Sequence, residues 1–150
     1  MNLKISPSSL KTAMMVFIQF LCIGILAATG KVIPENIFLL ILLISSFLLA
    51  LWAMLIMKFH FNAAPEVLDG AELNTRGPYR LIRHPMYTSL LGLGSAWIIN
   101  DFTFFRLFIL LILIANLIIK ISYEEKFLKE KFPDYSEYSK KTKRLIPFIY

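Results

Sequence analysis

The sequence predicts an all-α, polytopic membrane protein with about four transmembrane helices. Of its 150 residues, 57% are hydrophobic and only 17% are charged, and the mean hydropathy is +0.66, which is too apolar for a soluble domain. The apolar residues form blocks long enough to cross a bilayer. The basic residues gather between and after these blocks. Together these observations predict one integral membrane domain over residues 1–150.

The four predicted spans are residues 12–29, 37–57, 85–100 and 102–121. The first has no charged residue, is long for a signal-peptide core and is followed by no clear Ala-x-Ala cleavage site. We therefore expect a retained helix there. The second is the clearest span, because its twenty-one residues carry no charge.

The third predicted span is short, and its start carries two cationic side chains. Sixteen helical residues extend about 24 Å, against a hydrocarbon core of about 30 Å. Arg83 and His84 should therefore lie at or just beneath one interface. Pro85 suits the first turn of a helix, where free backbone N–H groups and the helix dipole favour an anion. The sequence predicts that this helix start holds a phosphate or carboxylate.

Side chains within the spans predict packing. Thr88, Gly92 and Ala96 recur every four residues and predict a small-residue stripe for close helix contact. Arg106 and Lys120 lie near the two ends of the fourth span, where we expect them to snorkel toward the interfaces.

The charge distribution predicts the topology. The loop 58–84 carries four lysines or arginines and the segment 120–150 carries eight, whereas the short connectors carry few. The positive-inside rule then places both termini, the long loop and the tail in the cytoplasm, and we expect the inner (cytoplasmic) membrane. This pattern argues against nucleic acid as a partner. Glu124 and Glu125 follow the fourth span on the same side of the membrane as Arg83 and His84. They are either partners for these two cationic side chains or ordinary solvated charges of the tail.

Metal and disulfide chemistry find no support in the sequence. The single cysteine, Cys22, lies inside the first apolar block, so no disulfide and no cysteine-based metal site can be formed. Two histidines, His60 and His84, are too few for a histidine-rich metal site, and we predict no metal; ligation that combines histidine with carboxylates is the alternative left open. The sequence leaves open whether His60 is a loop residue or part of a pocket entrance.

Several short motifs occur in a fixed order in the second half of the chain. They are Leu73-x-Thr75-x-Gly77-Pro78-Tyr79, Arg83-His84-Pro85-x-Tyr87, Glu124-Glu125, Phe132-Pro133-Asp134-Tyr135-x-x-Tyr138 and Arg144-Leu145-Ile146-Pro147. In this order and spacing they resemble the isoprenylcysteine carboxyl methyltransferase family, small integral membrane enzymes that are similar to phospholipid N-methyltransferases. The core motif region is 58–150.

The resemblance implies an S-adenosylmethionine-dependent methyltransferase whose cytoplasmic loop and helical C-terminal tail form the cofactor pocket. Carried over by position, the cofactor-binding residues are Tyr79, His84, Pro85, Tyr87, Glu124 and Glu125. The residues expected to support catalysis are Glu125, Lys120 and Arg83. A strand followed by a glycine-rich nucleotide loop is absent from the sequence, which agrees with this mode of binding.

The chemistry of methyl transfer leaves the acceptor open. The reaction is an in-line displacement, so positioning supplies much of the rate and no protein nucleophile is required. A carboxylate acceptor needs no base, whereas an amine or a thiol would have to lose a proton, to Glu124, Glu125 or His84. The resemblance favours an isoprenylcysteine-type carboxylate, and a phospholipid amine or a thiol is the alternative. We expect a lipidic or small apolar acceptor; the sequence does not indicate the oligomeric state.

Because the sequence departs from the family pattern at three positions, two other functions stay possible. Lys120 stands where enzyme members carry arginine, Ser89 where glycine is frequent, and Pro133 where glycine is usual. Lysine keeps the charge but lacks the planar fork that grips a carboxylate. Membrane sterol and enone reductases, which use NADPH, have a similar Arg-His-Pro-x-Tyr segment. A non-enzymatic membrane scaffold that kept the fold is the other reading.

Overall fold

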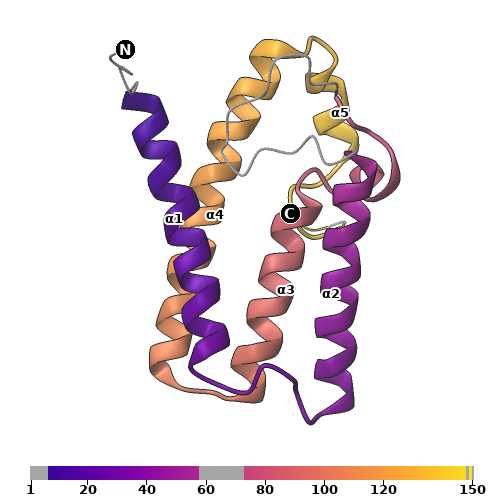
Figure 1. The fold of residues 1–150 in the computed structure, drawn as a ribbon. Coiled ribbons are helices and arrows are strands. Elements are labelled where there is room, and N and C mark those ends of the chain that lie inside the picture. The colour runs from indigo at the N-terminus through magenta and orange to yellow at the C-terminus, as the bar shows by residue number, and fades with distance from the viewer. Residues whose placement is uncertain (1–6, 58–72, 148, 150) are drawn as a thin grey trace.

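The computed structural model describes residues 7–57, 73–147 and 149, and every regular element in them is helical. The elements in chain order are α1 (Pro7–Ala28), α2 (Ile37–Ile56), the short 3-10 helix η1 (Gly77–Arg80), α3 (Pro85–Asn100), α4 (Phe104–Lys131) and α5 (Tyr135–Lys141). Figure 1 shows α1 beside α4 and α2 beside α3, with both short interhelical connections at the same end of the bundle. The all-helical prediction is confirmed.

Three of the described helices, α1, α2 and α4, are long and apolar enough to cross a membrane. The shorter α3 has the bounds expected from the sequence and lies between its neighbours, against α2 on one side and α1 and α4 on the other. Its sixteen residues extend about 24 Å. The arrangement is that of a polytopic helical membrane protein.

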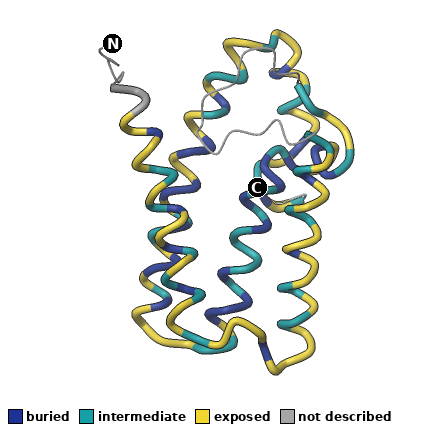
Figure 2. Tube along the Cα trace, viewed as in Figure 1, coloured by how far each residue is buried: buried dark blue, intermediate teal, exposed yellow. Residues whose placement is uncertain are grey.

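The burial pattern separates an interior from a lipid-facing exterior (Figure 2). The interior contains fully buried Leu26, Leu113 and Leu117, contributed by α1 and α4. Phenylalanines such as Phe17 and Phe38 point outward and are 67% and 77% exposed. An apolar exterior of this kind is stable in lipid, which accepts such side chains as readily as the interior does.

The small-residue stripe of α3 does allow a close helix approach. A Cβ at Gly92 would lie 2.1 Å from Ser46 Oγ and 3.1 Å from Ser46 Cβ. The absence of a side chain at position 92 therefore lets α3 lie directly on α2.

We expect Gly92→Ala to destabilise the protein by about 1–3 kcal/mol, because the added methyl group overpacks this contact. Thermal unfolding in detergent measures the loss. Ser46→Ala in the same chain removes the nearest colliding atom and should recover part of it. Strictly additive effects of the two substitutions would show that the contact is not the cause.

The prediction that Arg106 and Lys120 snorkel toward the interfaces is wrong. Their side chains are 1% and 0% exposed, because both lie on the face of α4 that packs against the other helices. Arg106 Nη2 donates to the carbonyl oxygens of Leu26, at 3.2 Å, and Trp97, at 2.9 Å. These carbonyls lie in the last turns of α1 and α3, so Arg106 caps both helix ends.

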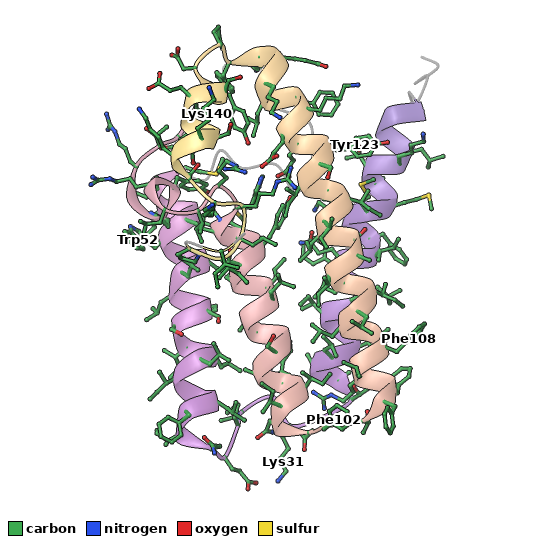
Figure 3. All side chains as sticks on the ribbon, turned by 180° about the vertical axis from the view of Figure 1, so that it is seen from behind. Lys31, Trp52, Phe102, Phe108, Tyr123 and Lys140 are labelled. Atoms are coloured by element: carbon green, nitrogen blue, oxygen red, sulfur yellow. The ribbon has the colours of Figure 1, made fainter. Side chains whose placement is uncertain are left out.

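α4 continues ten residues past the predicted end of the fourth span at residue 121. No glycine or proline interrupts its sequence before Pro133, and its glutamates, lysines and leucine favour helix. Figure 3 shows the consequence: Tyr123 and Lys140 lie at one end of the molecule, and Lys31 and Phe102 lie at the other. The helix thereby carries Glu124 and Glu125 toward the start of α3.

Candidate functional site

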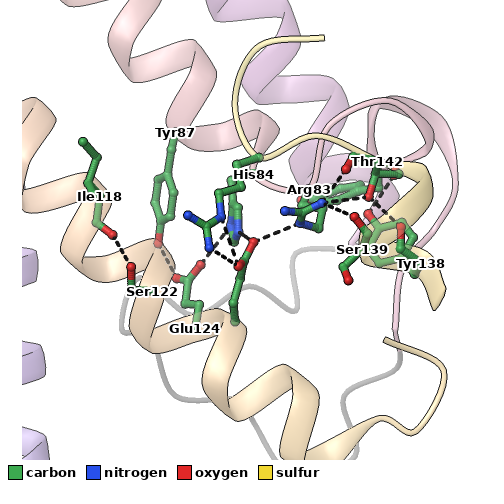
Figure 4. A network of polar contacts seen from close by, with 12 residues as sticks. Arg83, His84, Tyr87, Ile118, Ser122, Glu124, Tyr138, Ser139 and Thr142 are labelled. Carbon is green, nitrogen blue, oxygen red and sulfur yellow. Dashed lines mark hydrogen bonds and ion pairs between the residues drawn. The ribbon is translucent and has the colours of Figure 1, made fainter. Parts of the chain in front are cut away.

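The candidate site lies where the start of α3 meets the last turns of α4 and the C-terminal tail (Figure 4). His84 is the N-cap residue of α3, and Pro85 is its first residue. Proline suits this position because the N–H it lacks would have no partner inside the helix. The helix therefore begins where the sequence predicts, and it holds Arg83 and His84 at its mouth.

Glu125 is the centre of a buried charge cluster. Its side chain is 5% exposed, and Arg83 Nε donates to Oε1 at 2.9 Å. On the other oxygen, Arg144 Nη2 donates at 2.8 Å and Nε at 3.1 Å. His84 Nε2 lies 3.6 Å from Oε1, beyond hydrogen-bond distance but within reach of an ion pair. One carboxylate thus balances three basic side chains from two parts of the chain.

Glu124 binds the other side of His84. Its Oε2 lies 3.1 Å from His84 Nδ1, and its Oε1 accepts a hydrogen bond from the hydroxyl of Tyr87. The rings of His84 and Tyr87 stack with centroids 5.6 Å apart and 11° between their planes. The reading of Glu124 and Glu125 as ordinary solvated charges is therefore wrong, since both pair with residues at the start of α3.

The surroundings of His84 favour its charged form. Burial lowers the pKa of the imidazole, but the hydrogen bond to Glu124, the contact with Glu125 and their negative charges outweigh it and raise the pKa above its ordinary value. Because the folded state binds the proton more tightly than the unfolded chain, protonation of His84 stabilises the fold.

This shift predicts a pH dependence of stability. The contribution of His84 should be complete below about pH 6.5, the ordinary histidine pKa, and should disappear as pH rises through the higher folded-state pKa. One pKa unit of difference between the two states corresponds to about 1.4 kcal/mol. We expect the Tm in detergent to fall as pH rises above about 6.5, and His84→Gln to lack this part of the fall. Parallel curves for the two proteins would contradict the assignment.

The tail is attached to the segment that precedes α3 by main-chain hydrogen bonds. Ile82 and Lys143 form an isolated parallel bridge. Three main-chain bonds fix the tail: Arg83 N to Lys143 O at 2.7 Å, His84 N to Arg144 O at 3.0 Å and Lys143 N to Leu81 O at 3.1 Å. The side-chain hydroxyl of Thr88, in α3, donates to Leu145 O at 2.7 Å. Arg83 Nη1 also donates to the carbonyl oxygens of Ser139, at 2.8 Å, and Thr142. The tail is therefore part of the site.

Tyr138 and Tyr79 add further hydrogen bonds between the tail, η1 and the end of α2. The hydroxyl of Tyr138 donates to Tyr79 O at 2.7 Å, and the hydroxyl of Tyr79 donates to Met57 Sδ at 2.9 Å. Burial raises the pKa of Tyr138 to about 12, although the charge of Arg83 and a hydrogen bond with Thr142 act in the opposite direction. Both phenols are uncharged at neutral pH, since burial also raises the pKa of Tyr79.

Lys120 approaches the cluster from within the bundle, one helical turn before Glu124 on α4. Its Nζ lies 5.0 Å from the centroid of the Tyr87 ring, in cation–π geometry. It also donates to Gln19 Oε1 of α1 at 2.5 Å. The ammonium is therefore fixed between an amide oxygen and the ring face.

The structure brings most of the predicted site residues together. Arg83, His84, Tyr87, Glu124 and Glu125 form the cluster, with Pro85 buried beneath it and Lys120 beside it. Tyr79 lies in η1 next to α2 and joins the site through Tyr138. His60 lies outside the described residues. The predicted catalytic roles of Glu125, Lys120 and Arg83 stay predictions.

Sequence reasoning missed two residues of the arrangement. Arg144 begins the motif Arg144-Leu145-Ile146-Pro147, but nothing in that motif or in the basic tail around it indicated a contact with Glu125. Gln19 could have been found, because it is the one amide side chain in the apolar run 12–29. A polar side chain in an apolar span commonly pairs with a neighbouring helix.

These features define a helical integral membrane protein with a buried polar site at one end of its bundle. The family model for phospholipid methyltransferases matches residues 35–135, and the chain belongs to this family. It is accordingly a membrane methyltransferase, and the resemblance found in the sequence is confirmed at family level. No curated protein matched the chain in a sequence comparison. The family match covers α2, α3 and most of the site, and leaves out α1 and most of the tail.

Proposed function

We propose that the protein transfers a methyl group from S-adenosylmethionine to an acceptor that reaches the site from the membrane. The observation that supports this proposal is the match over residues 35–135, which contains His84, Tyr87, Glu124 and Glu125 in one buried cluster. Methyltransferases generally use this cofactor, and the cluster has the donors and acceptors that it requires.

The residues present fit the cofactor. It carries a carboxylate, a ribose diol, an adenine and a positively charged sulfonium. Arg83 and His84 at a helix N-terminus suit the carboxylate, and Glu124 can accept from the ribose hydroxyls. His84 Nε2 is buried and faces Glu125 Oε1 at 3.6 Å, but it makes no hydrogen bond to the residues that the structure describes, so an acceptor atom of a ligand would complete its hydrogen bonding.

In this proposal the chain contributes position and charge to the reaction. Glu125 holds Arg83 and Arg144 in place, and this fixes the tail over the site. Methyl transfer then depends on alignment of the acceptor with the methyl group, which a fixed site provides. Pro85 and Tyr79 shape the pocket, the first by starting α3 and the second by supporting the tail through Tyr138.

The acceptor we favour is an isoprenylcysteine-type carboxylate, because the buried ammonium of Lys120 would attract an anion. A phospholipid amine is the second candidate, favoured by the description of the matched family. An amine would have to lose a proton before it could attack, and Glu124, Glu125 or His84 would accept it. Either acceptor is lipidic and would enter sideways from the bilayer.

We further propose that residues 1–150 act as one domain, with the site at the cytoplasmic face of the inner membrane and both termini in the cytoplasm. The excess of lysine and arginine in the loop and the tail supports this orientation. A soluble cofactor would then enter from the cytoplasm, and a lipidic acceptor would arrive within the membrane.

Calorimetric titration of detergent-purified protein with S-adenosylmethionine, with its demethylated product and with NADPH tests the proposal. We expect micromolar binding of the first two, weakened at least about tenfold in His84→Ala and Glu124→Gln. Glu137→Gln is the matched control, because Glu137 forms an exposed pair with Lys141 away from the cluster. Binding of NADPH alone would support a reductase, and binding of neither cofactor would support a scaffold; both results contradict the proposal.

A further inference from the structure

Gln19 is a buried amide of α1, a helix that lies outside the family match. Among the side chains of α1 that the structure describes, from residue 10 onward, the buried ones are Thr12, Gln19, Cys22 and Leu26. Their spacing of seven, three and four residues places them on one stripe of the helix. Burying an amide in an apolar bundle is costly unless it is hydrogen-bonded, so the partner of Gln19 indicates what the residue does.

The partner is Lys120, whose Nζ donates to Gln19 Oε1 at 2.5 Å. Neither side chain is exposed to a significant degree, at 6% for Gln19 and 0% for Lys120. An ammonium on a flexible four-carbon chain takes its position from the groups that contact it. Here the amide oxygen lies on one side, and the Tyr87 ring face, 5.0 Å away, lies on the other.

Tyr87 connects this pair to the charge cluster. Its ring stacks on His84, and its hydroxyl donates to Glu124. His84 therefore holds the Tyr87 ring by stacking and Glu124 holds its hydroxyl, so the ring stays in place when Lys120 loses Gln19. A chain of side-chain contacts, from Gln19 through Lys120 to Tyr87, therefore joins α1 to the charge cluster.

We propose that Gln19 is a positioning residue of the methyl-transfer site, which holds the Lys120 ammonium against Tyr87 so that α1 helps to form the acceptor side. This inference rests on the proposed function. It assigns α1 a role in orienting the acceptor, whereas the cofactor side is formed by α3, α4 and the tail. Loss of Gln19 should therefore alter use of the acceptor and leave cofactor affinity unchanged.

The same two helices contain a matched control one turn away. Asn116 Nδ2 donates to Met15 O at 2.9 Å, and Asn116 is also buried. Met15 and Gln19 are four residues apart on α1, as Asn116 and Lys120 are on α4, and the helices run in opposite directions, so the two links cross between neighbouring turns (Figure 1). Asn116→Leu removes a polar link between α1 and α4 without removing a contact of the Gln19–Lys120 pair.

The test compares Gln19→Leu, Gln19→Glu and Asn116→Leu with the wild type in mixed micelles that contain a farnesylated cysteine or phosphatidylethanolamine. We expect Gln19→Leu to lower kcat/KM for the acceptor by about tenfold or more, with the Kd of S-adenosylmethionine unchanged. Gln19→Glu keeps an oxygen acceptor at the same place and should restore most of the activity. Asn116→Leu should retain the wild-type kcat/KM.

A second readout is independent of the reaction. The rate at which an amine-reactive acylating reagent labels Lys120, followed by mass spectrometry, should rise in Gln19→Leu and stay low in Asn116→Leu. Equal effects of these two variants on labelling and on kcat/KM would overturn the inference, because Gln19 would then only fasten two helices. A wild type inactive on both acceptors contradicts the proposed function, and the labelling comparison then decides the positioning role by itself.

Discussion

Replacing Glu125 by glutamine should release the tail from the bundle and abolish binding of S-adenosylmethionine. Glu125 is 5% exposed and accepts hydrogen bonds from Arg83 and Arg144. Without its charge, these guanidinium groups and His84 would face one another without their shared anion. Breaking a buried pair by removing one partner costs about 3–5 kcal/mol. We expect a loss of this size in thermal unfolding.

The measurement should separate detachment of the tail from unfolding of the bundle. Limited proteolysis after residue 135, followed by mass spectrometry, reports the tail, and circular dichroism reports the transmembrane helices. The bundle should remain helical in Glu125→Gln, while cleavage in the tail becomes at least about tenfold faster. The control is Glu137→Gln, whose exposed pair with Lys141 should contribute less than about 1 kcal/mol. Wild-type proteolysis of Glu125→Gln would contradict a central role for this carboxylate.

The second large effect is expected at the opposite end of the bundle, for Arg106→Ala. The buried guanidinium donates to Leu26 O and Trp97 O, and its removal leaves both carbonyls without this donor and opens a cavity. A hydrogen bond to a charged group contributes about 1.5–3 kcal/mol. We therefore expect a loss of about 3–5 kcal/mol in detergent, against less than about 0.5 kcal/mol for the exposed Lys129→Ala on the same helix.

Gly30 offers an independent check on this role of Arg106. A Cβ at position 30 would lie 1.4 Å from Arg106 Nη1, so Gly30→Ala must displace the guanidinium. Each single substitution should then destabilise the protein, and the double variant should be no less stable than Arg106→Ala alone. Additive losses would show that Gly30 and Arg106 act separately.

Much of the site could be predicted from local sequence. Pro85 after Arg83-His84 predicts a helix start, and the structure has it at that residue. Pairing of Glu124 and Glu125 with Arg83 and His84 was one of two interpretations of the sequence, and the contacts favour it over solvated charges. These predictions depend on short-range rules, which hold wherever the chain makes a simple turn.

The orientation of side chains around a helix was harder to predict. Arg106 and Lys120 were placed at the interfaces because of their distance along the helix, but both point into the bundle. The packing of α1 and α3 decides which face of α4 is buried, and the local sequence pattern of α4 does not predict that packing. The links from Lys120 to Gln19 and from Asn116 to Met15 have the same origin, since each joins residues about a hundred positions apart.

The sequence by itself determined the helical membrane fold, the start of α3, the family and most of the residues at the site. Hydrophobic length and proline chemistry act locally, so the printed residues are enough to predict them. Only the tertiary structure decided that Glu125 joins Arg83 to Arg144, and that α1 reaches the site through Gln19. These contacts depend on which helix faces meet and where the tail docks, because a buried charge is stable only where its partners converge.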